Sequence, residues 1–287
     1  MNPAKNSTSL LLILLSLIFQ LDTVAQKVPA TNQAACLRAV YQLDYNLDSV
    51  VTTPKRVLMI LRISNGTPRF GSAFNHISDS VYTNSPSLGE MERIQKAMDA
   101  PKGASRKNEF HYTILKTPAK GFISYHDDIA AEDYQYQENQ LSFPWRITPA
   151  KKTIAGHECQ QAYTAFGGRM WEAWFARDIA ASDGPYKFYG LPGLILQIRD
   201  THDHYVFSLL CLDVNPFPFD AAADTRTPMS IKSSAPIIKK AKFLQAKYND
   251  DVTFMDRMIA HGNQVPEGLR QNHVQMIKRR NNPLELK

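Results

Sequence analysis

The sequence is poor in cysteine, with three among 287 residues: Cys36, Cys159 and Cys211. At most one internal disulfide can form, and one thiol is then left over. A chain of this length can bury a core without covalent cross-links, so the fold does not require a bridge. Cys159 and Cys211 lie in strand-like segments, and we expect both to be small buried hydrophobic residues.

The sequence also lacks the short motifs of common hydrolases and nucleotide-binding proteins. There is no GxSxG and no HExxH, and the glycines between residues 184 and 193 do not follow a phosphate-binding spacing. A triad could be drawn from His157, Ser182 and Asp183, but triads are recognised by geometry and not by sequence position. These absences favour a non-catalytic protein. The alternative is a hydrolase whose active site one sequence does not reveal.

No set of four metal ligands has a recognisable spacing. His202 and His204 alternate, and His157 and Cys159 form a second pair of the same kind. Such ligands suit zinc or copper, but a closed site needs four of them. The polar run around His202 also fits the turn of a hairpin. We therefore expect no metal and no cofactor.

Long apolar runs are absent except at the start of the chain. A positive charge at Lys5 precedes the apolar segment 9–21, which is too short to span a bilayer comfortably. Small residues at Thr23 and Ala25 predict cleavage before Gln26, so residues 1–25 are expected to be a signal peptide. An uncleaved anchor is the alternative. A lipoprotein is excluded because Cys36 lies too far downstream. Residues 26–287 are expected to form one exported domain, in the periplasm, at the outer membrane or secreted, with no transmembrane span after cleavage.

The net charge of +6 is concentrated at the carboxyl end. From Ile231 onward there are eleven Lys and Arg against five Asp and Glu, and the preceding residues carry 22 of each sign. An exported protein seldom meets nucleic acid, so we expect none as a partner; a basic surface would instead meet anionic lipid or lipopolysaccharide. The lysines at 239, 240, 242 and 247 are interleaved among apolar positions, and this pattern favours a solvated helix face over a lipid-binding surface.

Residues 50–215 show mostly the apolar pattern of strands. The nearly continuous run 56–63 suits a strand covered on both faces. Short polar turns join the later segments, which favours antiparallel pairing because parallel pairs need long crossovers. The sequence predicts an α+β fold with a large antiparallel, curved sheet. The further strands are expected near residues 110–117, 121–127, 141–147, 157–166, 169–176, 194–198 and 205–214.

Helices are expected in two places. Met91, Ile94 and Met98 have helical spacing within residues 90–98, and the segment 230–280 is expected to be helical. There one apolar stripe contains Ile237, Ala241, Leu244 and Tyr248. Asp250 and Asp251 are predicted to cap a further helix, in which Val252, Met255, Met258 and Ile259 face inward and which Gly262 ends.

The segment 184–200, GPYKFYGLPGLILQIRD, concentrates glycine, proline and aromatic residues. Pro192 followed by Gly193 predicts a type II turn over residues 191–194, with Gly193 at positive φ. Gly190 permits a bend or a close approach, and a second turn is expected at Gly184 and Pro185. From residues alone this is a structural corner between two strands, built on Gly184, Pro185, Gly190, Leu191, Pro192 and Gly193.

The motif at residues 190–195 resembles that of the GLPGLI family, which takes its name from it. The similarity covers most of residues 26–287, including Ser72-Ala73-Phe74 followed by Asp79, and the terminal segment NNPLEL. Two positions depart mildly from the family pattern, His157 at a usual aromatic and Ala180 at a frequent proline. The resemblance implies an exported protein of the Bacteroidetes and no established molecular activity.

Aromatic residues are dense around the motif, and core packing accounts for at least half of them. A curved sheet with aromatics on its concave face and helices as a lid could also hold an acyl chain, as in periplasmic lipoprotein-carrier proteins. We therefore expect a non-catalytic envelope protein that binds an apolar, lipid-like ligand or an envelope protein. The candidate ligand-binding residues are Trp171, Trp174, Phe175, Tyr186, Phe188 and Tyr189.

Overall fold

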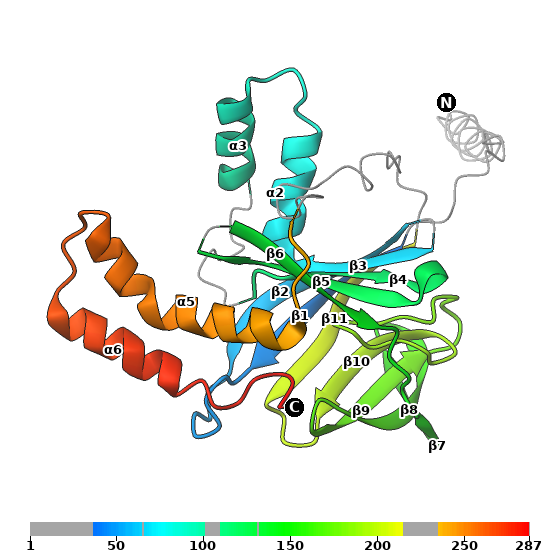
Figure 1. Cartoon of the computed structure of the whole chain (residues 1–287). Coiled ribbons are helices and arrows are strands. Elements are labelled where there is room, and N and C mark those ends of the chain that lie inside the picture. Colours follow the sequence, from blue (N-terminus) through cyan, green and yellow to red (C-terminus); the bar gives the residue numbers. More distant parts are fainter. Residues whose placement is uncertain (1–36, 65, 101–109, 131, 215–234, 287) are drawn as a thin grey trace, which may run out of the picture. The chain divides into compact units, whose positions relative to one another are not determined.

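The computed structural model describes residues 37–64, 66–100, 110–130, 132–214 and 235–286. The predicted signal peptide and Cys36 lie outside these residues. Labels follow Figure 1. The described strands are β1 Leu37–Tyr45, β2 Lys55–Ser64, β3 Thr67–Ser72, β4 Thr113–Thr117, β5 Phe122–Ile129, β6 Glu132–Asn139, β7 Arg146–Ile154, β8 His157–Phe166, β9 Arg169–Ala176, β10 Leu194–Asp200 and β11 Tyr205–Val214. The described helices are α2 Ala73–Thr83, α3 Glu90–Asp99, α5 Lys240–Ala260 and α6 Glu267–Lys278, with a 3₁₀ turn at Pro118–Lys120.

The described strands form one antiparallel sheet, in the order β6-β5-β4-β3-β2-β1-β11-β10-β9-β8-β7. Most neighbours are consecutive in sequence, as short polar turns require. The exception is the central pair β1–β11, which joins the first and last strands over nine matched positions with one bulge after Val40. The sheet is open, since β6 and β7 are its two edges. This confirms the predicted α+β class with a large antiparallel sheet.

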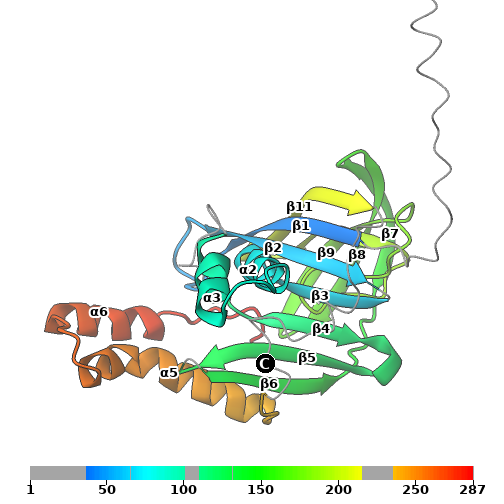
Figure 2. The same cartoon turned by 90° about the horizontal axis from the view of Figure 1, so that it is seen from above.

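The sheet is curved, and its concave side holds the main hydrophobic core (Figures 1 and 2). Alternate residues of β1 point into that core, for example Ala39, Tyr41 and Leu43. Curvature is required by contacts between strands far apart in the sheet order. Lys116 on β4 donates to Asp183 in the loop before β10 at 2.6 Å, although β3, β2, β1 and β11 lie between these two strands in the sheet.

Two helical hairpins flank the sheet (Figure 2). Helix α2 contacts β2 and β3 and pairs with α3, while α5 contacts β5 and β6 and pairs with α6. Ser72 caps α2, because its side-chain oxygen accepts from the backbone N–H of Asn75 at 3.2 Å. Within the described residues no helix combines the length and apolar character needed to cross a bilayer.

Several strand predictions were confirmed and others were wrong in position. The hairpin β4–β5 turns at Pro118–Lys120, and β10–β11 turns around His202, both as predicted. The strand predicted at residues 141–147 starts instead at Arg146 and continues to Ile154, through residues for which no element was predicted from the sequence. Strand β6, EDYQYQEN, was missed because a polar edge strand carries little apolar signal. Strands β1 and β3 and helix α2 were also missed.

The carboxyl-terminal helices differ from the prediction. Helix α5 runs without a break through Asp250 and Asp251, so these residues do not cap a second helix. It ends as predicted near Gly262, which has a φ of 85°. The stripe of Ile237, Ala241, Leu244 and Tyr248 faces solvent. The inner face presents Phe243, which packs on Tyr125 and Tyr136 of the sheet.

Farther along α5, the predicted inward-facing residues Val252, Met255 and Met258 are partly buried, and Ile259 is exposed. Of the two cysteines predicted to be buried, only one is. Cys159 is buried, but Cys211 is exposed because its side of β11 faces away from the core.

Candidate functional site

The loop between β9 and β10, residues 177–193, occupies the concave side of the sheet. Tyr186, Lys187 and Phe188 at its tip are almost entirely inaccessible to solvent. The ring of Phe188 lies 4.8 Å from that of Trp171, and the ring of Tyr186 lies 5.7 Å from that of Tyr112. The loop therefore joins the two halves of the curved sheet as part of the core, which explains why an irregular segment is so apolar.

The turn within this loop is tighter than predicted. The backbone N–H of Gly193 donates to the carbonyl of Leu191 at 2.8 Å, a three-residue pattern across Pro192 in place of a type II turn. Positive φ at Gly193 is confirmed, at 149°. A β-carbon at residue 193 would lie 2.0 Å from the carbonyl oxygen of Ala176, so only glycine fits against the end of β9.

A buried ion pair fixes the start of the loop. The ammonium of Lys116 donates to Asp183 at 2.6 Å and to the carbonyls of Gly184 and Phe188 at 3.0 and 2.8 Å. Burial lowers the pKa of Lys116 and raises the pKa of Asp183, while their mutual attraction opposes both shifts. With all its protons engaged, Lys116 holds the loop in place and has no donor left for a ligand.

A second charged cluster surrounds Lys187, whose side chain is fully buried. Its ammonium donates to Glu138 and, at 2.6 Å, to Glu285. Lys240 of α5 bridges the same two carboxylates at 2.7 and 2.6 Å. Burial alone would raise the pKa of Glu285, but the two lysines and the hydroxyl of Tyr186 outweigh it and lower that pKa. The cluster therefore links the loop, β6, α5 and the carboxyl-terminal segment.

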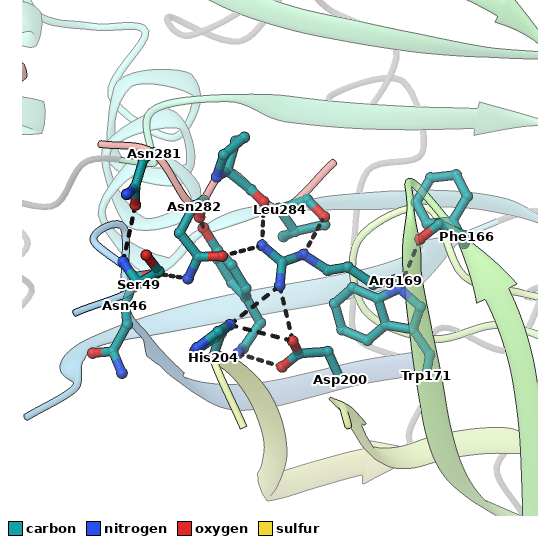
Figure 3. A network of polar contacts seen from close by, with 12 residues as sticks. Asn46, Ser49, Phe166, Arg169, Trp171, Asp200, His204, Asn281, Asn282 and Leu284 are labelled. Atoms are coloured by element: carbon teal, nitrogen blue, oxygen red, sulfur yellow. Dashed lines mark hydrogen bonds and ion pairs between the residues drawn. The ribbon is translucent and has the colours of Figure 1, made fainter. Parts of the chain in front are cut away.

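The carboxyl-terminal segment, residues 281–286, is bound through Arg169 at the start of β9 (Figure 3). The Arg169 guanidinium donates to Asp200 at 2.9 Å, to the carbonyls of Pro283 and Leu284, and to the side-chain oxygen of Asn282. The amide nitrogen of Asn282 donates in turn to the carbonyl of Asn46 at 2.6 Å. The segment that resembles a family ending is thus part of the folded core.

The predicted aromatic site residues lie in this core. Trp171, Phe175 and Phe188 have no exposed surface, and Trp174 and Tyr186 have almost none. Tyr189 is half-buried, and its hydroxyl donates to the carbonyl of Leu141. As predicted, Trp171 and Phe175 lie on one side of β9 and Trp174 on the other, where Trp174 donates to Glu172 at 2.8 Å. Ligand binding by these six residues stays a prediction. The described clefts have other linings.

Neither predicted pair of metal-ligating residues, His157 with Cys159 or His202 with His204, belongs to a larger group of ligands among the described residues. His157 contacts Asp178 at 2.6 Å, and burial raises the pKa of the neighbouring Cys159 thiol to about 11. The rings of His202 and His204 stack with centroids 5.6 Å apart. Among the described residues, no three His, Cys, Asp or Glu side chains are arranged to hold a metal ion.

The larger described cleft lies between the β1–β2 connection and α6, and we call it the α6 cleft. Its volume is about 520 Å³. Apolar side chains in its lining are Tyr45, Leu47, Val51 and Met276. Its cations are Lys55, Arg279 and Arg280, against one carboxylate, Asp48. An apolar wall beside an excess of positive charge suits a molecule with a hydrocarbon part and an anionic group.

Sequence reasoning missed the α6 cleft. The basic run Lys278-Arg279-Arg280 was counted only as surface charge, and residues 46–54 had no assigned element. The one signal available was Met276 close to that run, since methionine is common at adaptable binding surfaces. Nothing in the sequence places residues 45–55 against α6, because that contact depends on the tertiary fold.

The matches to known proteins concern a short segment and the fold. A family described as "Protein of unknown function (Porph_ging)" matches residues 166–197, which contain β9, the buried loop and the motif at residues 190–195. No curated protein matches the chain.

Two solved structures of PNGF-II, in the P2₁ and C2 space groups, are similar with a TM-score of 0.51 each. They share 12% and 11% sequence identity with this chain, and each match covers 76% of it. The chain spans 34% of the length of PNGF-II. At such low identity the likeness shows the fold alone. The chain is thus similar over residues 166–197 to a family of unknown function, and in fold to about a third of PNGF-II.

Proposed function

We propose that this protein is an exported, non-catalytic envelope protein of the GLPGLI type that binds an anionic, lipid-like molecule in the α6 cleft. The proposal rests on one observation, the combination of apolar wall and excess cations in a cleft of about 520 Å³. That volume lies within the range of roughly 300–1,000 Å³ typical of ligand sites. Export is inferred from the apolar start of the sequence, and family membership from the motif at residues 190–195.

The electrostatics of the cleft favour an anion. Arg280 is partly neutralised by Asp251 at 3.5 Å, whereas Arg279 makes no ion pair with the described residues. Asp48 is turned toward its own loop, where it accepts from the backbone N–H of Val50 at 3.0 Å. The net positive field attracts an anionic head group. Met276 and Val51, both about half exposed, offer apolar surface for a chain.

Binding is tested with monoacyl phosphatidylglycerol, which is anionic, against monoacyl phosphatidylcholine, which has no net charge. We expect the anionic lipid to bind at least tenfold more tightly, as measured by tryptophan fluorescence and calorimetry. The Met276→Asp variant should lose about tenfold in affinity, because it places a carboxylate against the acyl chain. The control is Met91→Asp on α3, since Met91 is also exposed but lies outside the cleft.

Equal binding of the two lipids, or equal loss in both variants, would contradict the proposal. Native mass spectrometry of protein taken from its own envelope provides an independent measurement, and we expect co-purifying anionic lipid there. An envelope protein in place of lipid would show that a protein partner is the physiological ligand.

A further inference from the structure

A second, smaller pocket lies between α2 and the β1–β2 pair, and we call it the α2 pocket. Its volume is about 200 Å³. Its apolar lining includes Ile60, Ile63, Ile77 and Val81, and its polar lining includes Arg62 and His76. This volume is smaller than the roughly 300 Å³ at which typical ligand sites begin, so an occupant must be small. No residue lines both this pocket and the α6 cleft.

His76 is the unusual group in this wall. Its side chain is only 4% exposed, and neither ring nitrogen makes a hydrogen bond of normal geometry. The backbone of Ile60 is near enough to favour a proton on the ring, but this does not compensate for burial. Buried polar groups without partners are uncommon in folded proteins, and they call for an explanation.

Positive charge surrounds this histidine. Burial, followed by the charges of Arg69 and Arg62, lowers the pKa of His76 well below its ordinary value. Arg69 is paired with the buried Asp79, and Arg38 at the pocket is paired with Asp213. Neither ring nitrogen of His76 bonds a carboxylate in the described part of the chain, so this histidine lacks the partner that would orient it as a catalytic base. The arrangement suits anion binding better than hydrolysis.

We propose that the α2 pocket binds a small apolar carboxylate, with its acid group facing Arg62 and His76 and its hydrocarbon against the isoleucines and Val81. A guanidinium recognises a carboxylate well, and the buried ring of His76 can donate to it through a nitrogen that bonds no described residue. A short aliphatic tail fills the space that the four β-branched side chains leave. This site is independent of the α6 cleft, so either proposal can fail without the other.

Hexanoate is the probe, and its effect is followed on the ring signals of His76 by NMR of the full chain. We expect a saturable shift of these signals with hexanoate and none with hexylammonium. Acetate, which has four fewer methylenes, should bind roughly 250-fold more weakly, because each buried methylene contributes about fourfold in affinity. This measurement needs no variant, so it holds even where a substitution unfolds the protein.

Variants then locate the site. Arg62→Gln should weaken hexanoate binding at least tenfold, whereas Arg146→Gln on the edge strand β7 should leave it unchanged. His202→Gln in the β10–β11 turn is the matched control for the histidine signals. Equal binding of hexanoate, hexanol and hexylammonium would overturn the proposal, as would the absence of any saturable His76 shift at millimolar hexanoate. Hydrolysis of a hexanoate ester that Arg62→Gln abolishes would overturn it in favour of catalysis.

Discussion

Gly193 shows at the residue scale why the motif at residues 190–195 has the composition it has. Its φ of 149° and the nearby carbonyl of Ala176 leave no space for a β-carbon. Gly193→Ala should therefore lower the free energy of unfolding by about 3 kcal/mol or more, because backbone must move. The measurement is chemical denaturation.

Gly156 provides the matched control for this substitution. It also has a positive φ, 85°, but an added β-carbon there would meet no atom within 4 Å. Gly156→Ala should cost only about 1 kcal/mol, the strain of the conformation itself. Equal losses at the two positions would mean that the contact with Ala176 is not the cause.

His126 predicts a pH dependence at the same scale. Burial, followed by the charge of Arg69, lowers its pKa to about 4, from 6.5 for a free ring. The folded state therefore holds a neutral ring where the unfolded chain would take up a proton. Stability from this group is complete above pH 6.5 and is lost as the pH falls toward 4. The loss should amount to about 3 kcal/mol, at 1.36 kcal/mol per pKa unit.

The free energy of unfolding of the wild type must be compared with that of His126→Asn over the same pH range. Burial raises the pKa of Asp127 to about 7, so Asp127 contributes in the opposite direction: its folded state gains stability as the pH falls through that value. The difference between the two proteins isolates His126. Parallel stability curves from pH 7 to 4 would show that His126 is not protected from protonation in the native state.

At the scale of elements, the carboxyl-terminal segment acts as a clamp on three strands. Asn282 receives a hydrogen bond from Arg169, donates to Asn46, and its carbonyl accepts from the hydroxyl of Tyr205 at 2.6 Å. Asn282→Ala should lower the free energy of unfolding by about 3 kcal/mol, since it leaves buried groups without partners. Amide exchange should rise in residues 46–49 in the same variant.

Asn281 is the natural control, because it is the neighbouring asparagine and is exposed. Its side-chain oxygen accepts from the backbone N–H of Ser49 at 3.0 Å. Asn281→Ala should cost less than about 1 kcal/mol, as for one exposed hydrogen bond. If Asn282→Ala loses no more stability than Asn281→Ala, the buried hydrogen bonds of Asn282 contribute little to the stability of the fold.

The elements that could be predicted from sequence are those in which the buried residues are apolar and follow the period of a strand or a helix. Strand β2 is an apolar run, and in the β4–β5 hairpin two apolar runs flank a turn at Pro118–Lys120. Both predictions were confirmed. Strand β6 could not be found this way, because edge pairing and Lys187 stabilise a polar sequence. In α5 the apolar stripe through Leu244 and Tyr248 faces solvent, while Phe243 is the buried side chain that packs on the aromatic rings of the sheet.

The candidate sites were less predictable for a related reason. The aromatics around residues 171–189 drew attention as binding residues, but in the fold they pack mainly against one another. The positively charged side chains, which look alike in the sequence, differ in their surroundings in the fold. Lys187 and Arg169 are buried in ion pairs, whereas Arg279 lines a cleft. Only the tertiary structure separates these two groups, since all are polar residues in mixed surroundings.

At the scale of the whole molecule, occupancy of the α6 cleft should be visible as stability. A ligand that binds only the folded state at one hundred times its dissociation constant adds about 2.7 kcal/mol. Monoacyl phosphatidylglycerol should therefore raise the melting temperature of the wild type, and Met276→Asp should reduce that rise. A similar rise in both proteins would indicate binding elsewhere, for example to the exposed stripe of α5.

The pairing of β1 with β11 has a consequence for the time course of folding. The central ladder of the sheet joins Leu37 to Val214, and the clamp joins Asn46 to Asn282. Contacts between positions so distant in sequence close large loops, so they form slowly and late. While the chain emerges from a ribosome, the apolar faces of its amino-terminal strands stay uncovered until β11 has been made. The protein should therefore depend on holding factors before it is complete, and complete its core only once residue 282 is free.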